Sequence, residues 1–397
     1  MNRFFLIFRI SKQNFKWSFI KYKNANYFLL NEQDSIKVNS VDELNKNLQT
    51  IEKFVLSHAS PEQIKTTVVF DDDQLQGLSI KTTNVKLAMP NNIAKINVKN
   101  ELTTKLENSF NLNFSNVLNY NPYLYKVTTI EDDHKEYDQF PLNKPAKSLE
   151  VLYSVLHADQ ASDLDNLKKL FNNYKFGQVS FNIKTLTLTS HLKAYDSYNL
   201  VIDLNQDYLA VAICNKGSAL KYSKTLVGSR KILNRLSKAT NLKANDVLNR
   251  IKTLEQNPTY SQNFDIKNLQ IIKEELNYFL KDLEKFIYEF VDLKQIKNKI
   301  EFNVIAFSGV LARYLSNNFN LSELKHKRIQ TLEAHQNLML FECSDLSTTG
   351  ALNLANNYSI ESMSKIDTLT SHYSINPKKT PMQRLKDFFV INKTNNL

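Results

Sequence analysis

Glycine is scarce in this chain, which has only six glycines in 397 residues. An average composition of about 7% glycine would give roughly four times as many. Loops that cradle phosphate groups depend on glycine, because without a side chain the backbone N–H groups can approach an anion closely. The chain therefore has little material for glycine-rich phosphate loops.

Cysteine and histidine are also few, and neither shows metal-binding spacing. Cys214 and Cys343 lie far apart, and the seven histidines form no H-x-x-x-H, H-E-x-x-H or mixed Cys/His cluster. We expect no catalytic or structural metal site, and two thiols that pack in a reducing cytosol. A G-x-S-x-G nucleophile motif is absent as well, so we assign no catalytic residue.

Long apolar runs are missing. A membrane-spanning helix needs about 18 apolar residues, and no stretch approaches that length. Near the start, the apolar residues 4–8 are interrupted by Arg9 and Lys12, short of the roughly 7–15 residues of a signal peptide. We expect a cytoplasmic protein unless another element attaches it to a surface.

Arginine is under-represented in a chain with a formal net charge of +11. Only eight basic residues are arginines, and they are scattered, whereas Lys, Asn, Ile and Phe are abundant, as expected of an AT-rich genome. No zinc-finger spacing, RNP-like aromatic motif or helix-turn-helix pattern accompanies the charge. We expect no nucleic-acid partner, although a basic nucleic-acid-binding protein is one alternative.

What is present is a strong α/β pattern, centred on residues 199–229. Three apolar or β-branched strands are joined by turns at 204–207 and 215–217, and Gly228 precedes a helix. Asp203 ends the first strand, at the carboxyl edge where α/β sheets place their ligands. The alternative for Asp203 is a simple turn former.

The order of elements on both sides of this stretch resembles the FtsA family of bacterial cell-division proteins, in the actin-like superfamily. The resemblance extends from a strand at 149–157 and a helix at 159–173 to Ser308-Gly309 and a late helix at 346–353. It implies an α/β, actin-like (ribonuclease H-like) fold of two halves, each with an inserted subdomain. As a member of that family the chain would be divergent.

The resemblance also implies the domain boundaries. They are a first-half core at 1–84, joined by 181–198 and part of 355–376; an FtsA-type insertion at 85–180; a second-half core at 199–228 and 300–354; a second-half insertion at 229–299; a linker at 361–379; and a C-terminal helix at 380–393.

Actin-like proteins bind ATP with Mg²⁺ through an acid and small residues in a first hairpin, a glycine-rich turn in a second, and paired glycines. Here Ser11, Asp203 and Gly309 stand at the corresponding positions. Arg9 replaces the acid, Leu204 follows Asp203, and Val310 replaces the second glycine. We expect nucleotide binding to be weakened or lost, and no more than a degenerate ATPase.

The second insertion begins with a basic stretch at 229–254, which holds seven basic residues and one acid, a balance of +6. It includes Arg230, Arg235 and Arg250. The resemblance implies that this subdomain binds the C-terminal tail of the tubulin-like protein FtsZ. The alternative is an ordinary solvated helix face.

Residues 380–393 have the pattern of a short basic amphipathic helix, with Pro381 at its first turn. Met382, Leu385, Phe388 and Phe389 share one face, and Arg384 and Lys386 lie on the other. This pattern suits an anionic membrane surface. A helix docked on its own domain and a partner-binding peptide are the alternatives.

The implied function is that of a self-associating, peripheral protein that tethers FtsZ to the cytoplasmic membrane at the division site. Two alternatives keep the fold: an ATP-binding actin-like filament protein, and an actin-like platform of a pilus-assembly system.

Overall fold

The computed structural model describes residues 3–357, apart from 13, 24–25, 39, 90–97, 110–115, 138–139, 159–160, 193–196, 257–265, 292–299, 320–323 and 333–344. The predicted C-terminal helix and the linker before it lie outside the described residues.

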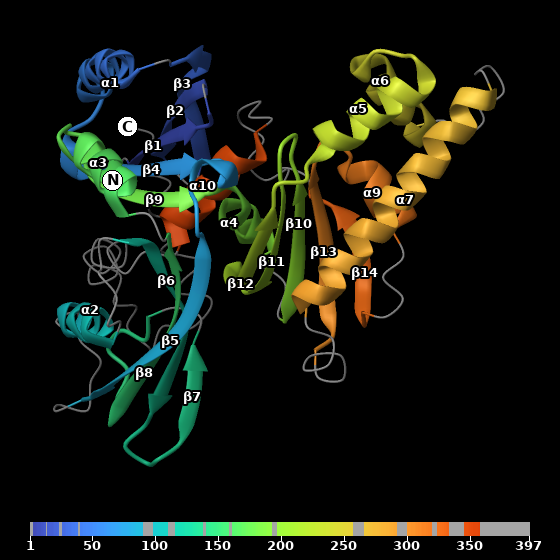
Figure 1. Cartoon of the computed structure of the whole chain (residues 1–397). Coiled ribbons are helices and arrows are strands. Elements are labelled where there is room, and N and C mark those ends of the chain that lie inside the picture. The colour runs from blue at the N-terminus through green and yellow to red at the C-terminus, as the bar shows by residue number, and fades with distance from the viewer. Residues whose placement is uncertain are drawn as a thin grey trace, which may run out of the picture. The chain divides into compact units, whose positions relative to one another are not determined.

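The first half of the chain forms a five-stranded mixed sheet (Figure 1). Its order is β3-β2-β1-β4-β9; β1, β4 and β9 run parallel, and β2 is antiparallel to both of its neighbours. The strands are β1 (Arg3–Ile10), β2 (Asn14–Lys23), β3 (Asn26–Lys37), β4 (Ile64–Phe70) and β9 (Gln178–Ile183).

Helices cover both faces of this sheet. On one face lie α1 (Val41–Leu56) and α3 (Ala161–Asn172); the buried side of α1 packs with Phe4, Leu6 and Phe8 of β1. On the other face, Ala351 and Leu352 of α10 (Leu346–Asn357) pack with the alternate residues of the strands. Successive side chains of β1 point to opposite faces of the sheet, so this strand contributes to a hydrophobic core on each side.

Between β4 and β9 the chain forms an antiparallel sheet of order β5-β8-β6-β7, accompanied by α2 (Val98–Ser109). Its strands are β5 (Ser79–Ala88), β6 (Val117–Thr128), β7 (His134–Tyr137) and β8 (Ser148–His157). A short 3₁₀ helix at Asp72–Gln74 leads from β4 into it.

The second half repeats the topology of the first. Its sheet has the order β12-β11-β10-β13-β14, again with β10, β13 and β14 parallel and β11 antiparallel to its neighbours. The strands are β10 (Tyr198–Leu204), β11 (Leu209–Asn215), β12 (Ser218–Thr225), β13 (Phe302–Gly309) and β14 (His326–Thr331). The predicted two-half α/β fold is confirmed.

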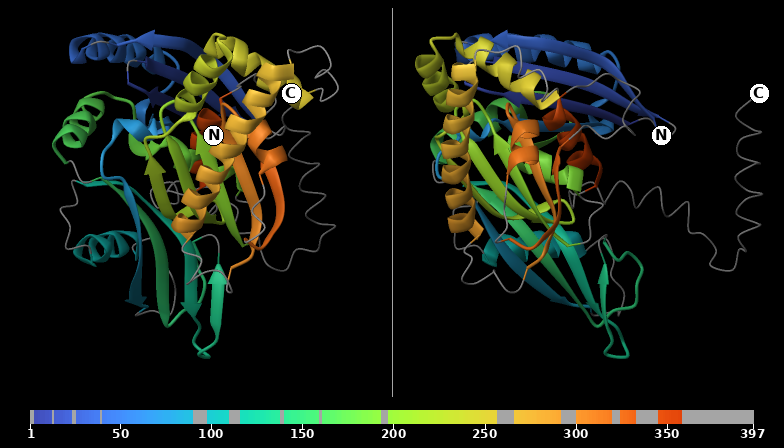
Figure 2. Two further views of the ribbon diagram at one scale, coloured as in Figure 1. Left: turned by 45° about the vertical axis from the view of Figure 1, so that its right-hand side comes forward. Right: turned by 90° about the vertical axis from the view of Figure 1, so that its right-hand side faces the viewer.

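In the described part of the chain, helices cover one face of the second sheet (Figure 2). They are α5 (Ser229–Thr240), α6 (Ala244–Gln256), α7 (Ile266–Val291) and α9 (Ala312–Asn318), with α6 packed on α5 and α9. The buried side of α7 includes Ile272, Leu276, Leu283 and Ile287, which recur every three or four residues and pack with the sheet. None of the described helices is long and apolar enough to cross a membrane.

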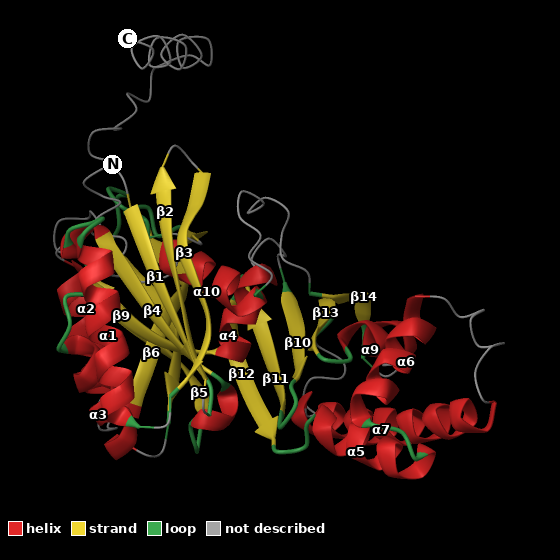
Figure 3. Ribbon diagram, turned by 90° about the horizontal axis from the view of Figure 1, so that it is seen from above, coloured by secondary structure: helices red, strands yellow, loops and turns green. Residues whose placement is uncertain are grey.

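Two helices, α4 (Lys184–Thr189) and α10, lie between the sheets and contact each other (Figure 3). Their approach is close, because a Cβ on Gly350 would lie 2.2 Å from the carbonyl oxygen of Thr187. The Ser190 hydroxyl also donates to the Gly350 carbonyl at 3.0 Å. Small residues therefore let the halves join through two directly packed helices.

Candidate functional site

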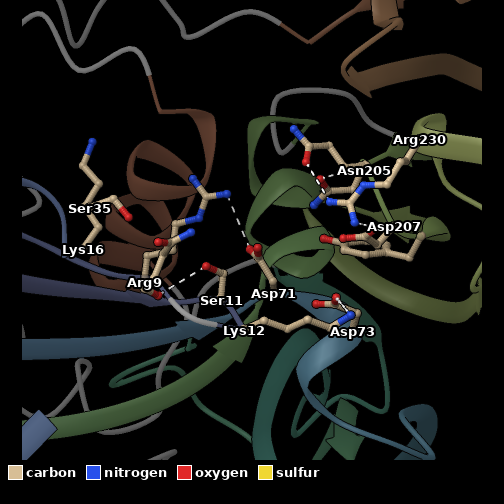
Figure 4. A pocket seen from close by; sticks show the side chains of 13 residues that line it. Arg9, Ser11, Lys12, Lys16, Ser35, Asp71, Asp73, Asn205, Asp207 and Arg230 are labelled. Atoms are coloured by element: carbon tan, nitrogen blue, oxygen red, sulfur yellow. Dashed lines mark hydrogen bonds and ion pairs between the residues drawn. The ribbon is translucent and has the colours of Figure 1, made fainter. Parts of the chain in front are cut away.

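A polar cleft of about 550 Å³ separates the first hairpin of each sheet (Figure 4). One wall carries the β1–β2 turn with Ser11, together with Asp71 and Asp73 beyond β4. The opposite wall carries the β10–β11 turn from Asn205 to Tyr208, and Arg230. The two hairpins face each other because equivalent strands of the two sheets end at this cleft.

Of the three predicted nucleotide-site residues, only Ser11 lines the cleft. Asp203, the last-but-one residue of β10, is fully buried. Gly309 ends β13 with φ +101°, and a Cβ there would lie 1.9 Å from the Leu204 carbonyl oxygen. The glycine therefore allows β13 to pack closely on β10.

Lys184 neutralises Asp203. Its ammonium donates to the two carboxylate oxygens at 2.8 and 3.1 Å, and the two side chains are 11% and 0% exposed. Lys184 directly follows β9 of the first sheet, whereas Asp203 belongs to the second. No sequence motif indicated this lysine, because the pair is separated by 19 positions and formed by tertiary structure.

Arg9 bridges two further carboxylates. Its guanidinium lies 2.8 Å from Asp345 and 3.5 Å from Asp71. Burial would raise the pKa of Asp345, but Arg9 and the Ser347 backbone N–H outweigh it, so this pKa lies below its usual value. Burial raises the pKa of Asp71, with Arg9 opposing the shift. Arg9 stands where the resemblance implies an acid, and it pairs with Asp71 and Asp345 instead.

Asp72 is buried beside this network. Its carboxylate accepts hydrogen bonds from the Tyr222 hydroxyl at 2.8 Å and from the Thr185 backbone N–H at 3.1 Å, while Lys224 donates to its backbone carbonyl. Burial raises the pKa of Asp72 to about 6, with the nearby Asp203 adding to the shift and the hydrogen bonds opposing it.

The N-terminus of α5, a potential anion site, is engaged internally. The backbone N–H groups of Ser229 and Arg230 donate to the carbonyls of Asn205 and Gln206, both at 2.8 Å. Gly228 is required for this contact, because a Cβ there would lie 2.3 Å from the Gln206 carbonyl oxygen. The helix dipole is therefore directed at the turn and not at a ligand.

The other cationic groups of the cleft have acidic neighbours as well. Lys12 lies 3.2 Å from Asp73, and Arg230 lies 3.0 Å from Asp207 (Figure 4). No group of three or more His, Cys, Asp or Glu side chains within the described residues could hold a metal ion. The residues of the cleft therefore do not fit ATP with Mg²⁺: the acid is neutralised, the helix N-terminus is occupied, and neither hairpin turn contains glycine.

No family model matches the chain, and no curated protein matches it either. Among solved structures, the chain is similar to the PilM–PilN type IV pilus biogenesis complex, at 15% identity with a TM-score of 0.46, covering 88% of this chain and 97% of that one. It is also similar to a Bacteroides thetaiotaomicron protein with an actin-like ATPase fold, at 12% identity and TM-score 0.36, covering 88% and 95%. A third similar structure is the cytoplasmic domain of EpsL of the Vibrio cholerae type II secretion system, at 10% identity and TM-score 0.32, covering 88% and 94%.

These similarities are distant. The fold is recognised from the sheet order, which occurs in both halves of the chain. The fold is actin-like. Within this actin-like fold, the cleft lies between the first hairpins of the two halves, where the resemblance to FtsA implies nucleotide binding.

A second, apolar groove of about 240 Å³ lies beside α5 and α7. Its apolar lining comes from both helices and from the sheet, and includes Leu209, Val227, Ile232, Phe279, Leu283 and Phe286. Lys231, Arg235 and Asp282 also line it. The groove is therefore an apolar site bordered by charged side chains of both signs.

The three arginines predicted to bind a partner do not converge. Arg235 lines the groove and pairs with Glu275 at 2.5 Å, whereas Arg230 lines the polar cleft. Arg250 is half-buried on α6. The residues predicted to bind the membrane, Met382, Arg384, Leu385, Lys386, Phe388 and Phe389, lie outside the described residues.

Proposed function

We propose that this chain is a non-catalytic, FtsA-like adaptor that tethers the C-terminal tail of FtsZ to the cytoplasmic membrane at the division site. The observation that carries the proposal is the apolar groove beside α5 and α7. A tether needs a binding site that works without turnover, and this groove is formed by well-packed elements of the second half.

The groove has the chemistry to bind a short peptide with apolar and acidic residues. Phe286 is partly exposed beside the buried Phe279 and Leu283, which form the floor of the groove. A peptide side chain that is fully buried in such a site contributes roughly 1.5–3 kcal/mol. Lys231 and Arg235 would attract acids of the peptide and speed its association. FtsZ tails, which are short and often acidic, have this character.

The membrane side of the tether is assigned to residues 380–393. Their apolar face and the basic residues around it suit reversible binding to anionic lipid. Self-association of the chain would multiply such weak anchors.

Peptide binding tests the groove. A fluorescent FtsZ tail from the same organism should bind the full chain, and Phe286→Glu should weaken binding by about tenfold or more. Arg235→Glu should slow association and reduce its salt dependence. Tyr278→Glu is the matched control, because Tyr278 is 60% exposed on the same helix and outside the groove lining, so its affinity should not change.

Equal affinity of the Phe286→Glu and Tyr278→Glu variants would show that the groove is not the peptide site. Binding of the cytoplasmic tail of a pilus-assembly membrane protein in place of the FtsZ tail would instead favour the pilus-platform alternative.

A further inference from the structure

The two halves of the molecule are connected by buried polar contacts that the chain itself supplies. Lys184, at the end of the first sheet, holds Asp203 of the second at 2.8 Å. Both side chains are almost completely removed from solvent. An unpaired carboxylate at this depth would be strongly unfavourable, so Asp203 needs a positive partner.

Asp72 makes a second connection, in the opposite direction. It follows β4 of the first sheet, and it accepts from Tyr222 of β12 in the second. Lys224 of the same strand donates to the backbone carbonyls of Asp72 and Leu75. The Thr189 hydroxyl of α4 adds a bond of 2.7 Å to the carbonyl of Gly217, in the β11–β12 turn.

A bound metal ion could in principle neutralise such a buried carboxylate, and its dissociation would then leave the carboxylate unpaired. A ligand can shift a conformational equilibrium only through different affinities for the two states. A lysine side chain is covalently attached, so it cannot dissociate from the site as a metal ion can. We propose that Lys184 is a tethered cation that replaces a bound metal ion, and that it holds the two halves in one arrangement without nucleotide. This inference does not depend on the adaptor role.

The arrangement of the halves can be measured with spin labels at Lys53→Cys in α1 and Lys273→Cys in α7, which are both exposed, in a full-length chain carrying Cys343→Ser. We expect one narrow distance that saturating ATP and Mg²⁺ leave unchanged. A second distance, or a shift caused by ATP and Mg²⁺, would overturn the proposal.

The tethered charge is tested by Lys184→Ala, which leaves Asp203 unpaired. The melting temperature of this variant should fall, and ethylammonium or Mg²⁺ should partly restore it at constant ionic strength, whereas the bulkier choline should not. Lys147→Ala, which breaks the exposed pair with Asp132, is the matched control and should show neither effect. Absence of cation-specific recovery in a folded Lys184→Ala variant would contradict the proposal.

If Lys184→Ala does not fold, the neutral double variant Lys184→Ala with Asp203→Asn replaces it, because no unpaired charge remains. We expect this variant to fold, to show no response to cations, and to give a broadened inter-half distance. An unchanged, narrow distance would show that the ion pair does not hold the halves.

Discussion

Asp72 connects protonation to stability at the scale of a single residue. Its folded-state pKa of about 6 lies above the ordinary value of 3.8, since burial disfavours the charged form. The folded state therefore holds the proton to higher pH than the unfolded state does. Ionisation of Asp72 lowers stability as the pH rises from about 4 to above 6, by up to roughly 3 kcal/mol.

Asp72→Asn should remove this cost. Asn keeps the shape and an acceptor for Thr185 or Tyr222, and it does not ionise. We expect the melting temperature of the variant, relative to that of the wild type, to increase between pH 4 and pH 8. Asn317→Ala changes no ionisable group at an exposed position, so its difference from the wild type should be the same at every pH. A constant difference across the pH range would contradict the assigned pKa.

Position 309 requires glycine for a structural reason, although the sequence pattern indicated a nucleotide-binding role. Its φ of +101° disfavours any side chain, and a Cβ would overlap the Leu204 carbonyl at 1.9 Å. Gly309→Ala should lower the free energy of unfolding by about 2–4 kcal/mol in denaturant titrations. Asn317→Ala, exposed on α9, should change it by less than about 0.5 kcal/mol. Equal effects of the two substitutions would refute this reading of Gly309.

At the scale of elements, sequence patterns predicted part of the fold. The strands β10, β11 and β12 follow from apolar and β-branched runs separated by turn residues. The elements β8, α3 and α10 lie where the resemblance implied a strand at 149–157 and helices at 159–173 and 346–353. The short strands β7 and β14 are polar and show no apolar pattern in the sequence. They form by pairing with β6 and β13, which local sequence does not reveal.

The helix α4 shows why part of the site was not predictable. Its sequence, KTLTLT, alternates like a strand, yet it forms a helix in which the Thr187 and Thr189 hydroxyls donate to carbonyls three residues earlier. Packing against the second sheet and α10 overrides the local preference. Since α4 carries Lys184, the partner of Asp203 could not be found from spacing.

The S-x-x-E pattern of Ser40 and Glu43 is typical of a helix start, and α1 begins there. The Ser40 hydroxyl accepts the Glu43 backbone N–H at 3.2 Å. Ser40→Ala should cost about 1 kcal/mol of stability, because this N–H then loses its cap. Ser40→Asp should retain stability, and a denaturant series of the three proteins gives the comparison. Equal stability of the Ala variant and the wild type would show that the cap contributes nothing.

At the scale of the whole molecule, the proposed tether requires attachment to a membrane, and none of the described helices is long and apolar enough to cross one. Replacing Leu385 and Phe389 by Glu should release the protein from anionic liposomes in a flotation assay, because charge on the apolar face opposes its insertion. The melting temperature should not change. Thr394→Glu supplies the matched control at a position outside the predicted helix. Continued flotation of the double variant would show that residues 380–393 are not the anchor.

The packing of α10 on the first sheet has a consequence for biosynthesis. Phe5, Ile7, Ile20 and Val69 are made early, but Ala351 and Leu352, which cover them, come roughly 280 to 350 residues later. At typical rates of translation, this apolar surface stays uncovered for roughly 15–60 s on each nascent chain. The first half therefore cannot complete its folding as it leaves the ribosome, and this surface stays open to chaperones until α10 has been synthesised.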